Sequence, residues 1–364
     1  MIFFGFFSFL NSLFAQENPE IPQIAFVGSN KKVDRVVKRI IRKKKTPGLA
    51  ITVSKNGNTI FQKGYGYANI EKKIPVNAKT SVFRVASVSK PLAATVLAKM
   101  VEQEKIDLDT SLYTYLPEFP KKKYDFTIRQ LGGHLAGIRT YKDNEFLNNN
   151  PLSISEGVAL FANDKLLFEP GTKYFYNSYD WVLISAAVQN ITKTPFEKYT
   201  KENVLVPLQM NHTYPDSTSI NIPELVSFYS RARGKKFRKA KTVNNFFKLA
   251  GGGFLSTSED ISKLGNAYLV TNFLKPEVIS EFLTSQKIGD KLTYYGIGWE
   301  VSYDHKKRPY MGHTGNGVGG YAFFRIYPAQ QMVFTILTNM TNPAIEKEFR
   351  IIVDEIMSAV LPVE

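Results

Sequence analysis

Ser87 and Lys90 are spaced as a nucleophile and its base could be. They stand in FRVASVSKPL (residues 83–92), which is typical of an extended run that enters a helix spanning about 87–104. Residues i and i+3 share one helical face, about 5–6 Å apart at Cβ, so the ammonium can reach the hydroxyl. A serine needs such a neighbour to become a good nucleophile. A helix N-terminus adds free N–H groups and a positive dipole end beside Oγ.

A Ser-x-x-Lys spacing also arises by chance in a Lys-rich chain, where it marks a helix cap and a solvated lysine. Two later stretches bear on this choice. EPGTKYFYNSY (169–179) precedes an expected helix, and GHTGNGVGGY (312–321) lies on or beside an expected strand. Taken singly, Tyr176 could be one more core aromatic among 19 tyrosines, and His313 could be a strand residue without a task.

The elements that must position these groups follow from periodicity and turn signals. Apolar residues at helical spacing predict a helix over 30–45. Two extended runs, 49–54 and 59–67, flank KNGN (55–58), and Asn-Gly is a strong hairpin signal. From 107 to about 245 strand signals thin out, and helical patterns occur over 127–134, 154–162, 179–190 and 195–204.

The C-terminal part returns to strands. Ser256 or Thr257 is expected to cap a helix after AGGGFLST (250–257). Extended runs follow over 294–303, 310–313, 321–327 and 332–339, before a last helix at 344–360. We therefore expect an α/β (α+β) fold in which both chain ends build one antiparallel sheet with terminal helices on one face. In this division, an α/β lobe (30–86 and 246–364) holds an inserted, mostly helical lobe (87–245), with the active site in the cleft between them.

The three motifs, in this order, resemble those of penicillin-recognising serine hydrolases. The resemblance runs from Pro47 to about Asn339 and is to the serine β-lactamase and penicillin-binding-protein family, in its class C β-lactamase and D-alanyl-D-alanine carboxypeptidase group (peptidase S12 type). LPEFP (116–120), HLAGIR (134–139) and AGGGFLST (250–257) are most similar to its mitochondrial serine β-lactamase-like branch. It implies a β-lactamase/transpeptidase-like fold and catalysis through an acyl-enzyme.

The resemblance also implies roles for single residues. Ser87 would be the acylated nucleophile, and Lys90 would accept its proton or tune the neighbouring base. Tyr176 would relay protons, provided that cations such as Lys90 lower the pKa of its phenol. The backbone N–H groups of Ser87 and Asn316 would form the oxyanion hole.

Four further residues are expected to contact substrate: Ser178, His313, Thr314 and Gly315. Ser178 stands where the family has asparagine, unless a shifted register lets Asn177 do that work. His313 stands where β-lactamases usually carry lysine, and an imidazole that titrates near neutrality would attract a substrate carboxylate only weakly. We therefore expect a peptide, a D-amino-acid peptide or an ester as substrate, with a true β-lactamase as an alternative.

Other conspicuous residues have structural interpretations. We expect His134, Arg84 and Arg325 to be structural, and the glycines at 251–253 to pack the sheet against the active site, since no P-loop lysine follows them. The chain has no cysteine, which excludes disulfides and thiolate metal sites, and its four histidines lack metal-binding spacing. No metal or cofactor is expected.

Charge and the N-terminus bear on partners and location. The net charge of +15 gathers in runs at 43–45, 121–123 and 231–241, which we interpret as solvated loops, so no nucleic-acid partner is expected. MIFFGFFSFLNSLFA (1–15) is typical of a signal peptide cleaved after Ala15, followed by a linker (16–29), and no later stretch could span a membrane. The sequence thus predicts an exported protein, periplasmic or secreted. A weakly active or inactive scaffold that self-assembles is the alternative function, and the oligomeric state stays open.

Overall fold

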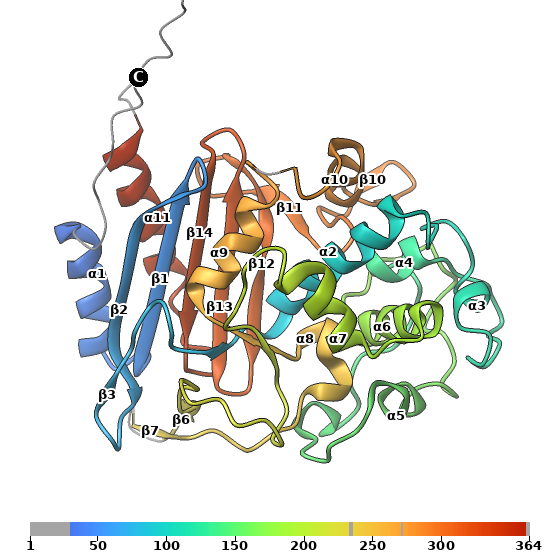
Figure 1. Cartoon of the computed structure of the whole chain (residues 1–364), viewed down its shortest axis with the longest axis horizontal. Helices are drawn as coiled ribbons and strands as arrows, with labels where there is room; N and C mark the ends of the chain where they lie inside the picture. Colours follow the sequence, from blue (N-terminus) through green and yellow to red (C-terminus); the bar gives the residue numbers. More distant parts are fainter. Residues whose placement is uncertain (1–29, 233–235, 271, 362–364) are drawn as a thin grey trace, which may run out of the picture.

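The computed structural model describes residues 30–232, 236–270 and 272–361, so the predicted signal peptide and linker lie outside the described residues. A seven-stranded antiparallel sheet runs through the molecule in the order β11-β12-β13-β14-β1-β2-β3 (Figure 1). Its strands are β1 (Gly48–Lys55), β2 (Asn58–Asn69), β3 (Ile74–Pro75), β11 (Glu300–Tyr303), β12 (Pro309–Gly317), β13 (Gly320–Tyr327) and β14 (Met332–Thr338). Because β1 pairs with β14, the two chain ends share one sheet, as the sequence predicted.

The hairpin β1–β2 forms at the predicted Asn-Gly turn. Asn56 and Gly57 have φ values of 49° and 79°, the left-handed conformation that a tight two-residue hairpin turn requires. The strand pairing continues from there to Gly48 opposite Gly66, with one irregularity beside Val53. This register places the apolar side chains of β1 alternately on the two faces of the sheet, and both faces are covered.

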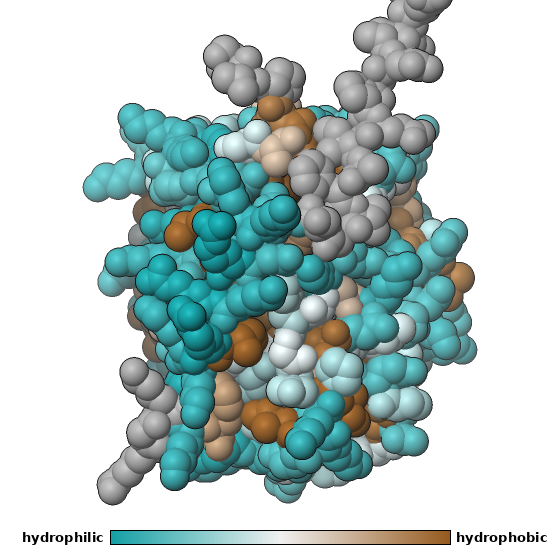
Figure 2. Space-filling model, turned by 90° about the vertical axis from the view of Figure 1, so that its left-hand side faces the viewer, coloured by the Kyte–Doolittle hydropathy of each residue, from teal (hydrophilic) through white to brown (hydrophobic). Residues whose placement is uncertain are grey.

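Helices α1 (Lys31–Arg42) and α11 (Glu346–Val360) cover one face of the sheet. The Asn30 side chain caps α1 by accepting from the backbone N–H groups of Lys32 and Val33. Val33, Val37 and Ile40 point inward and join the buried face of α11 and the outward side chains of the sheet in one apolar cluster. The opposite side of α1 is rich in lysine and arginine, and Figure 2 shows this end of the molecule as largely hydrophilic.

The other face of the sheet packs on α2 (Ser89–Glu102), α9 (Ser258–Asn266) and the helical lobe beyond them (Figure 1). The Thr257 side chain accepts from Asp260 N and so caps α9. The remaining helices are α3 (Leu112–Tyr115), α4 (Ile128–Gly132), α5 (Ile154–Ala159), α6 (Tyr179–Thr192), α7 (Phe196–Thr200), α8 (Leu249–Gly252) and α10 (Pro276–Leu283). The predicted α/β class and inserted helical region are confirmed.

Smaller strands lie around the edges of the sheet and beside the helical region. They are β4 (Phe83–Arg84) with β8 (Phe254–Ser256) and β5 (Tyr214–Pro215), the pair β6 (Tyr229–Arg231) and β7 (Phe237–Lys239), and the pair β9 (Lys287–Ile288) and β10 (Lys291–Leu292). The helix predicted over 195–204 continues beyond α7 as a π-helical stretch, Lys201–Leu205. The predicted helix at 87–104 begins at Ser89, after a single 3-10 turn, Ala86–Val88.

Candidate active site

Ser87 lies in the 3-10 turn between β4 and α2, not within the helix itself. The residue before it, Ala86, has a φ of 47°, a left-handed conformation that costs energy for any residue with a Cβ. Gly315 of β12 packs directly against this turn, since a Cβ there would lie 2.1 Å from Val85 O. The strained turn is thus fixed by close backbone packing, and it leaves Ser87 half-buried at the surface of a cavity.

Lys90 is completely buried beneath Ser87. Its Nζ lies 3.3 Å from Ser87 Oγ, 3.2 Å from Ser178 Oγ and 2.6 Å from Gly251 O. No carboxylate lies within ion-pair distance of Nζ among the described residues. Burial lowers the pKa of Lys90 to about 7, partly opposed by the negative charge of Asp180. Near neutral pH the amine is therefore available as a base.

Tyr176 lies over this group. Its ring centroid is 4.6 Å from Lys90 Nζ and 4.6 Å from the ring of His134, and 38% of the residue is exposed. Enclosure by these neighbours raises the pKa of the Tyr176 phenol, while a hydrogen bond with Ser87 acts in the opposite direction. The expectation that nearby cations lower this pKa is wrong, because burial raises it instead. Tyr176 therefore keeps its proton at neutral pH.

Ser178, and not Asn177, contacts Lys90. Asn177 is buried with its amide turned toward Asp180 Oδ2 at 2.7 Å and Ile138 O at 3.2 Å. The shifted register that would let Asn177 act in the cleft is therefore wrong. Gly251 makes room for Ser178, because a Cβ at Gly251 would lie 2.6 Å from Ser178 O.

His313 is buried and does not titrate near neutrality. Its Nε2 lies 2.9 Å from Tyr295 Oη and its Nδ1 lies 2.8 Å from Thr314 O. Because a carbonyl can only accept, Nδ1 carries the proton and Nε2 accepts from the phenol. Burial lowers the pKa of His313 to about 4, although the charge of Glu300 opposes the change. The expected pH-dependent attraction for a carboxylate is thus wrong, since His313 is a neutral imidazole at physiological pH.

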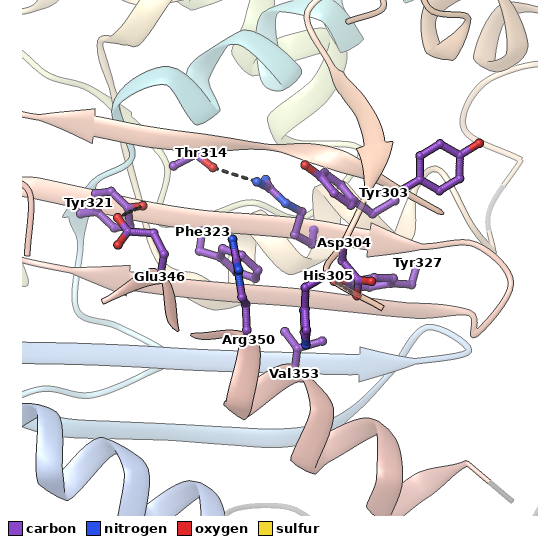
Figure 3. Close-up of a pocket in the computed structure, with 12 residues that line it drawn as sticks. Tyr303, Asp304, His305, Thr314, Tyr321, Phe323, Tyr327, Glu346, Arg350 and Val353 are labelled. Carbon is purple, nitrogen blue, oxygen red and sulfur yellow. Dashed lines mark hydrogen bonds between the residues drawn. The ribbon is translucent and has the colours of Figure 1, made fainter. Parts of the chain in front are cut away.

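Thr314 points away from Ser87. Side chains alternate along β12, so His313 faces the cleft and Thr314 faces α11. Its Oγ1 accepts from Arg325 Nη2 at 2.9 Å (Figure 3). The structure therefore brings together Ser87, Lys90, Tyr176, Ser178 and His313, but not the Thr314 side chain.

The cavity at Ser87 has a volume of about 250 Å³. Asn316 and Gly317 of β12 form one wall of this cavity. That the backbone N–H groups of Ser87 and Asn316 form an oxyanion hole stays a prediction. The Asn316 side chain accepts from Asn342 N at 3.2 Å, a contact that fixes this end of the strand. The full lining is Arg84, Ala86, Ser87, Tyr141, Phe146, Ser178, Asn245, Lys248, Gly251, Gly252, Asn316, Gly317 and Val318.

Lys248 is a lining residue that the sequence analysis missed. The residue is 7% exposed, and its Nζ donates to Phe146 O at 3.1 Å. It makes no ion pair with any carboxylate of the described residues, and burial lowers its pKa to about 8. Arg84, by contrast, is paired with Asp216 at 2.6 Å and is structural, as expected. The only sequence signal for Lys248 was its position just before the glycine run.

Asp180 is the second group that the sequence did not single out. Its Oδ2 lies 2.8 Å from His134 Nδ1, and both side chains are completely buried. Burial raises the pKa of Asp180 and lowers that of His134. The His134 ring packs on Tyr176 and on Tyr295, with centroids 4.6 and 4.8 Å apart. This packing agrees with the expected structural role of His134, because it holds the Tyr176 ring in place.

The described residues contain no group of three or more side chains that could hold a metal ion. Within the same residues, no helix is both long and apolar enough to cross a bilayer.

The family model described as beta-lactamase matches residues 33–354, nearly the whole chain. The chain belongs to the β-lactamase family. The human protein named serine beta-lactamase-like protein LACTB, mitochondrial, is 28% identical over 80% of this chain and 70% of its own length. The predicted family membership is thus confirmed, and the predicted similarity to the mitochondrial serine β-lactamase-like protein is found.

Solved structures agree on the fold. The octameric penicillin-binding protein homologue from Pyrococcus abyssi superposes with a TM-score of 0.77 at 21% identity, covering 88% of this chain and 76% of that one. The D-amino acid amidase from Ochrobactrum anthropi SV3 superposes with a TM-score of 0.78 at 18% identity, covering 91% and 99%. Both likenesses confirm the β-lactamase/transpeptidase-like fold.

Proposed function

We propose that this β-lactamase-family protein is a serine hydrolase that works through an acyl-enzyme on Ser87. The observation that carries the proposal is the Lys90 amine, 3.3 Å from Ser87 Oγ, buried, without a carboxylate partner and with a pKa of about 7. A neutral amine in that position can take the serine proton as Oγ attacks a carbonyl. A solvated lysine at a helix cap, the alternative interpretation, would keep its charge and have no reason to be buried.

The remaining groups supply the other steps. The N–H groups of Ser87 and Asn316 would hold the oxyanion of the tetrahedral intermediate. Tyr176 keeps its proton and is placed to pass it to the leaving group, taking up in turn the proton that Lys90 removed from Ser87. Water then attacks the ester at Ser87, and the same groups return the proton to Oγ.

The substrate that fits this cleft is an ester or a peptide, including peptides of D-amino acids. The neutral His313 provides no cation on β12 for the carboxylate that β-lactams and carboxypeptidase substrates carry. A relative in fold named D-amino acid amidase supports an amide substrate. The true β-lactamase remains the less favoured alternative.

We propose further that Lys248 selects substrates with an anionic acyl group. Among the basic side chains that line the Ser87 cavity, Lys248 is the one that forms no ion pair with a carboxylate of the described residues. A charge-assisted hydrogen bond contributes about 1.5–3 kcal/mol, which corresponds to about 10–100-fold in kcat/KM. Lys248→Met should lower kcat/KM for a glutaryl nitrophenyl ester by that factor and leave the neutral valeryl ester nearly unchanged. An equal loss for both esters would count against selection by charge, and Lys248→Arg is the charge-preserving control.

The nucleophile is tested by intact mass after exposure to a fluorophosphonate and, separately, to a penicillin. Wild type should gain one phosphonyl adduct that Ser87→Ala lacks and that Ser358→Ala, an exposed serine of α11, retains. An adduct on Ser87→Ala, or none on wild type, would contradict the proposal. A penicillin adduct that hydrolyses with turnover would support the β-lactamase alternative.

Export and self-assembly remain predictions. The name of the Pyrococcus relative describes an octamer, and that assembly is a property of the relative. Light scattering at several salt concentrations would test self-assembly of this chain, because its charge of +15 should oppose association most strongly at low salt.

A further inference from the structure

A second cavity lies on the opposite face of the sheet from Ser87, between α11 and strands β11 to β13 (Figure 3). Its volume is about 350 Å³, in the range of small-molecule sites. We call it the outer cavity, and it shares no lining residue with the cavity at Ser87. Its lining is Tyr303, Asp304, His305, Tyr310, Thr314, Tyr321, Phe323, Arg325, Tyr327, Glu346, Arg350 and Val353.

The walls of the outer cavity are aromatic. Five of its lining residues are tyrosine or phenylalanine, and they come from β11, β12 and β13. The Arg325 guanidinium lies against two of these rings, 4.3 Å from the Tyr310 centroid and 4.9 Å from the Phe323 centroid. Flat faces of this kind favour a planar ligand that can stack on them.

Most charges of the outer cavity are already compensated. Arg325 Nη2 lies 2.9 Å from Glu300 Oε2, and Asp304 Oδ2 lies 2.6 Å from Arg308 Nη2. His305 faces Asp354 at 3.0 Å on the α11 side. These pairs leave little net charge on the strand side of the cavity.

Two lining residues of α11, Glu346 and Arg350, form no ion pair with the described residues. The Arg350 side chain rises from α11 toward the sheet and ends near Phe323 (Figure 3). It forms no hydrogen bond or ion pair with the described residues. Glu346, one turn earlier on α11, accepts from Tyr321 Oη at 2.9 Å instead of pairing with Arg350. A guanidinium without a hydrogen-bond partner can bind a carboxylate through two parallel hydrogen bonds, and the Glu346 carboxylate beside it is held by Tyr321.

We propose that the outer cavity binds a small planar aromatic anion, an aryl carboxylate, with the carboxylate on Arg350 and the ring against Phe323 and Tyr310. This goes beyond the hydrolase proposed above and does not depend on it. The floor of the site includes Thr314, the residue after His313, so the ligand lies directly behind the strand that forms one wall of the cleft.

The test is calorimetric titration of the full chain with 2-naphthoate. Wild type should bind one equivalent saturably, and the neutral 2-naphthamide should bind about tenfold or more weakly. Arg350→Met should raise the naphthoate Kd by the same factor. Lys347→Met removes an equal charge from an exposed position of α11 outside the cavity and should leave Kd within about twofold.

Three outcomes would overturn the proposal. One is the absence of saturable naphthoate binding to wild type. Another is an unchanged Kd in Arg350→Met, and since Arg350 is exposed and unbonded, that variant should fold normally. The third is loss of binding in Lys248→Met with full binding in Arg350→Met, which would place the anion in the Ser87 cavity.

Discussion

Burial determines which of the basic side chains around Ser87 carry a positive charge at neutral pH. Lys90 and His313 are both buried, and burial moves both pKa values downward, to about 7 and about 4. The amine is therefore half-titrated near neutrality, whereas the imidazole is neutral. In this site Lys90 can therefore lose its proton near neutral pH, and His313 is an uncharged hydrogen-bond partner of Tyr295.

This charge distribution predicts how hydrolysis depends on pH. A lysine is a base only above its pKa, so kcat/KM should rise as pH increases through about 7 and then level off. Lys90→Met should lose the rise together with at least about 10²-fold in rate. His313→Gln should keep the midpoint near 7, because His313 has already lost its proton well below that pH. A profile with its midpoint near 4 would instead identify His313 as the base.

At the scale of elements, the site depends on backbone segments that approach more closely than a Cβ allows. Gly251 of α8 and Gly315 of β12 pack against the backbone of two segments near Lys90, those that contain Ser178 and Val85. The first touches Ser178, and the second touches Val85 just before the strained turn. Close approach of α8 is what brings Gly251 O within 2.6 Å of Lys90 Nζ.

Two neighbouring glycines give a matched test of this packing. A Cβ at Gly251 would lie 2.6 Å from Ser178 O, whereas at Gly252 its nearest neighbour, Ala86 C, is 3.8 Å away. Gly251→Ala should therefore lower the free energy of unfolding by about 1–3 kcal/mol. Gly252→Ala should be neutral or slightly stabilising, since alanine restricts the unfolded chain. Urea unfolding followed by circular dichroism measures both, and similar losses in the two variants would show that close approach is not the reason.

The same elements show what the sequence could predict. The Asn-Gly turn and the two extended runs beside it predicted β1 and β2, and motif order singled out Ser87, Lys90 and Tyr176. What escaped prediction depends on contacts between distant residues. The carbonyl that binds Lys90 Nζ comes from a position 161 residues later, and the Tyr295 phenol on His313 is not part of any local pattern. Burial, and with it the pKa of each group, follows from such contacts, so Lys248 could not be recognised either.

At the scale of the whole molecule, the sheet separates two apolar clusters. One lies between the sheet and the helical region that holds the site. The other lies between the sheet and the terminal helices α1 and α11. Since β1 pairs with β14, the sheet that contains β12 is complete only when both chain ends have folded. We therefore expect the site to depend on the stability of the terminal cluster.

Helix α11 allows this dependence to be measured. Phe349 is completely buried and packs on Phe323 and Tyr321 of β13, with ring centroids 5.4 and 6.2 Å apart, whereas Ile351 on the same helix is 45% exposed. Phe349→Ala should cost about 3–5 kcal/mol of unfolding free energy, and Ile351→Ala less than about 0.5 kcal/mol. If the sheet couples the two clusters, Phe349→Ala should unfold in one transition in which phosphonylation of Ser87 and far-ultraviolet dichroism are lost together. Labelling that survives the loss of helix signal would instead show that the site folds without its terminal layer.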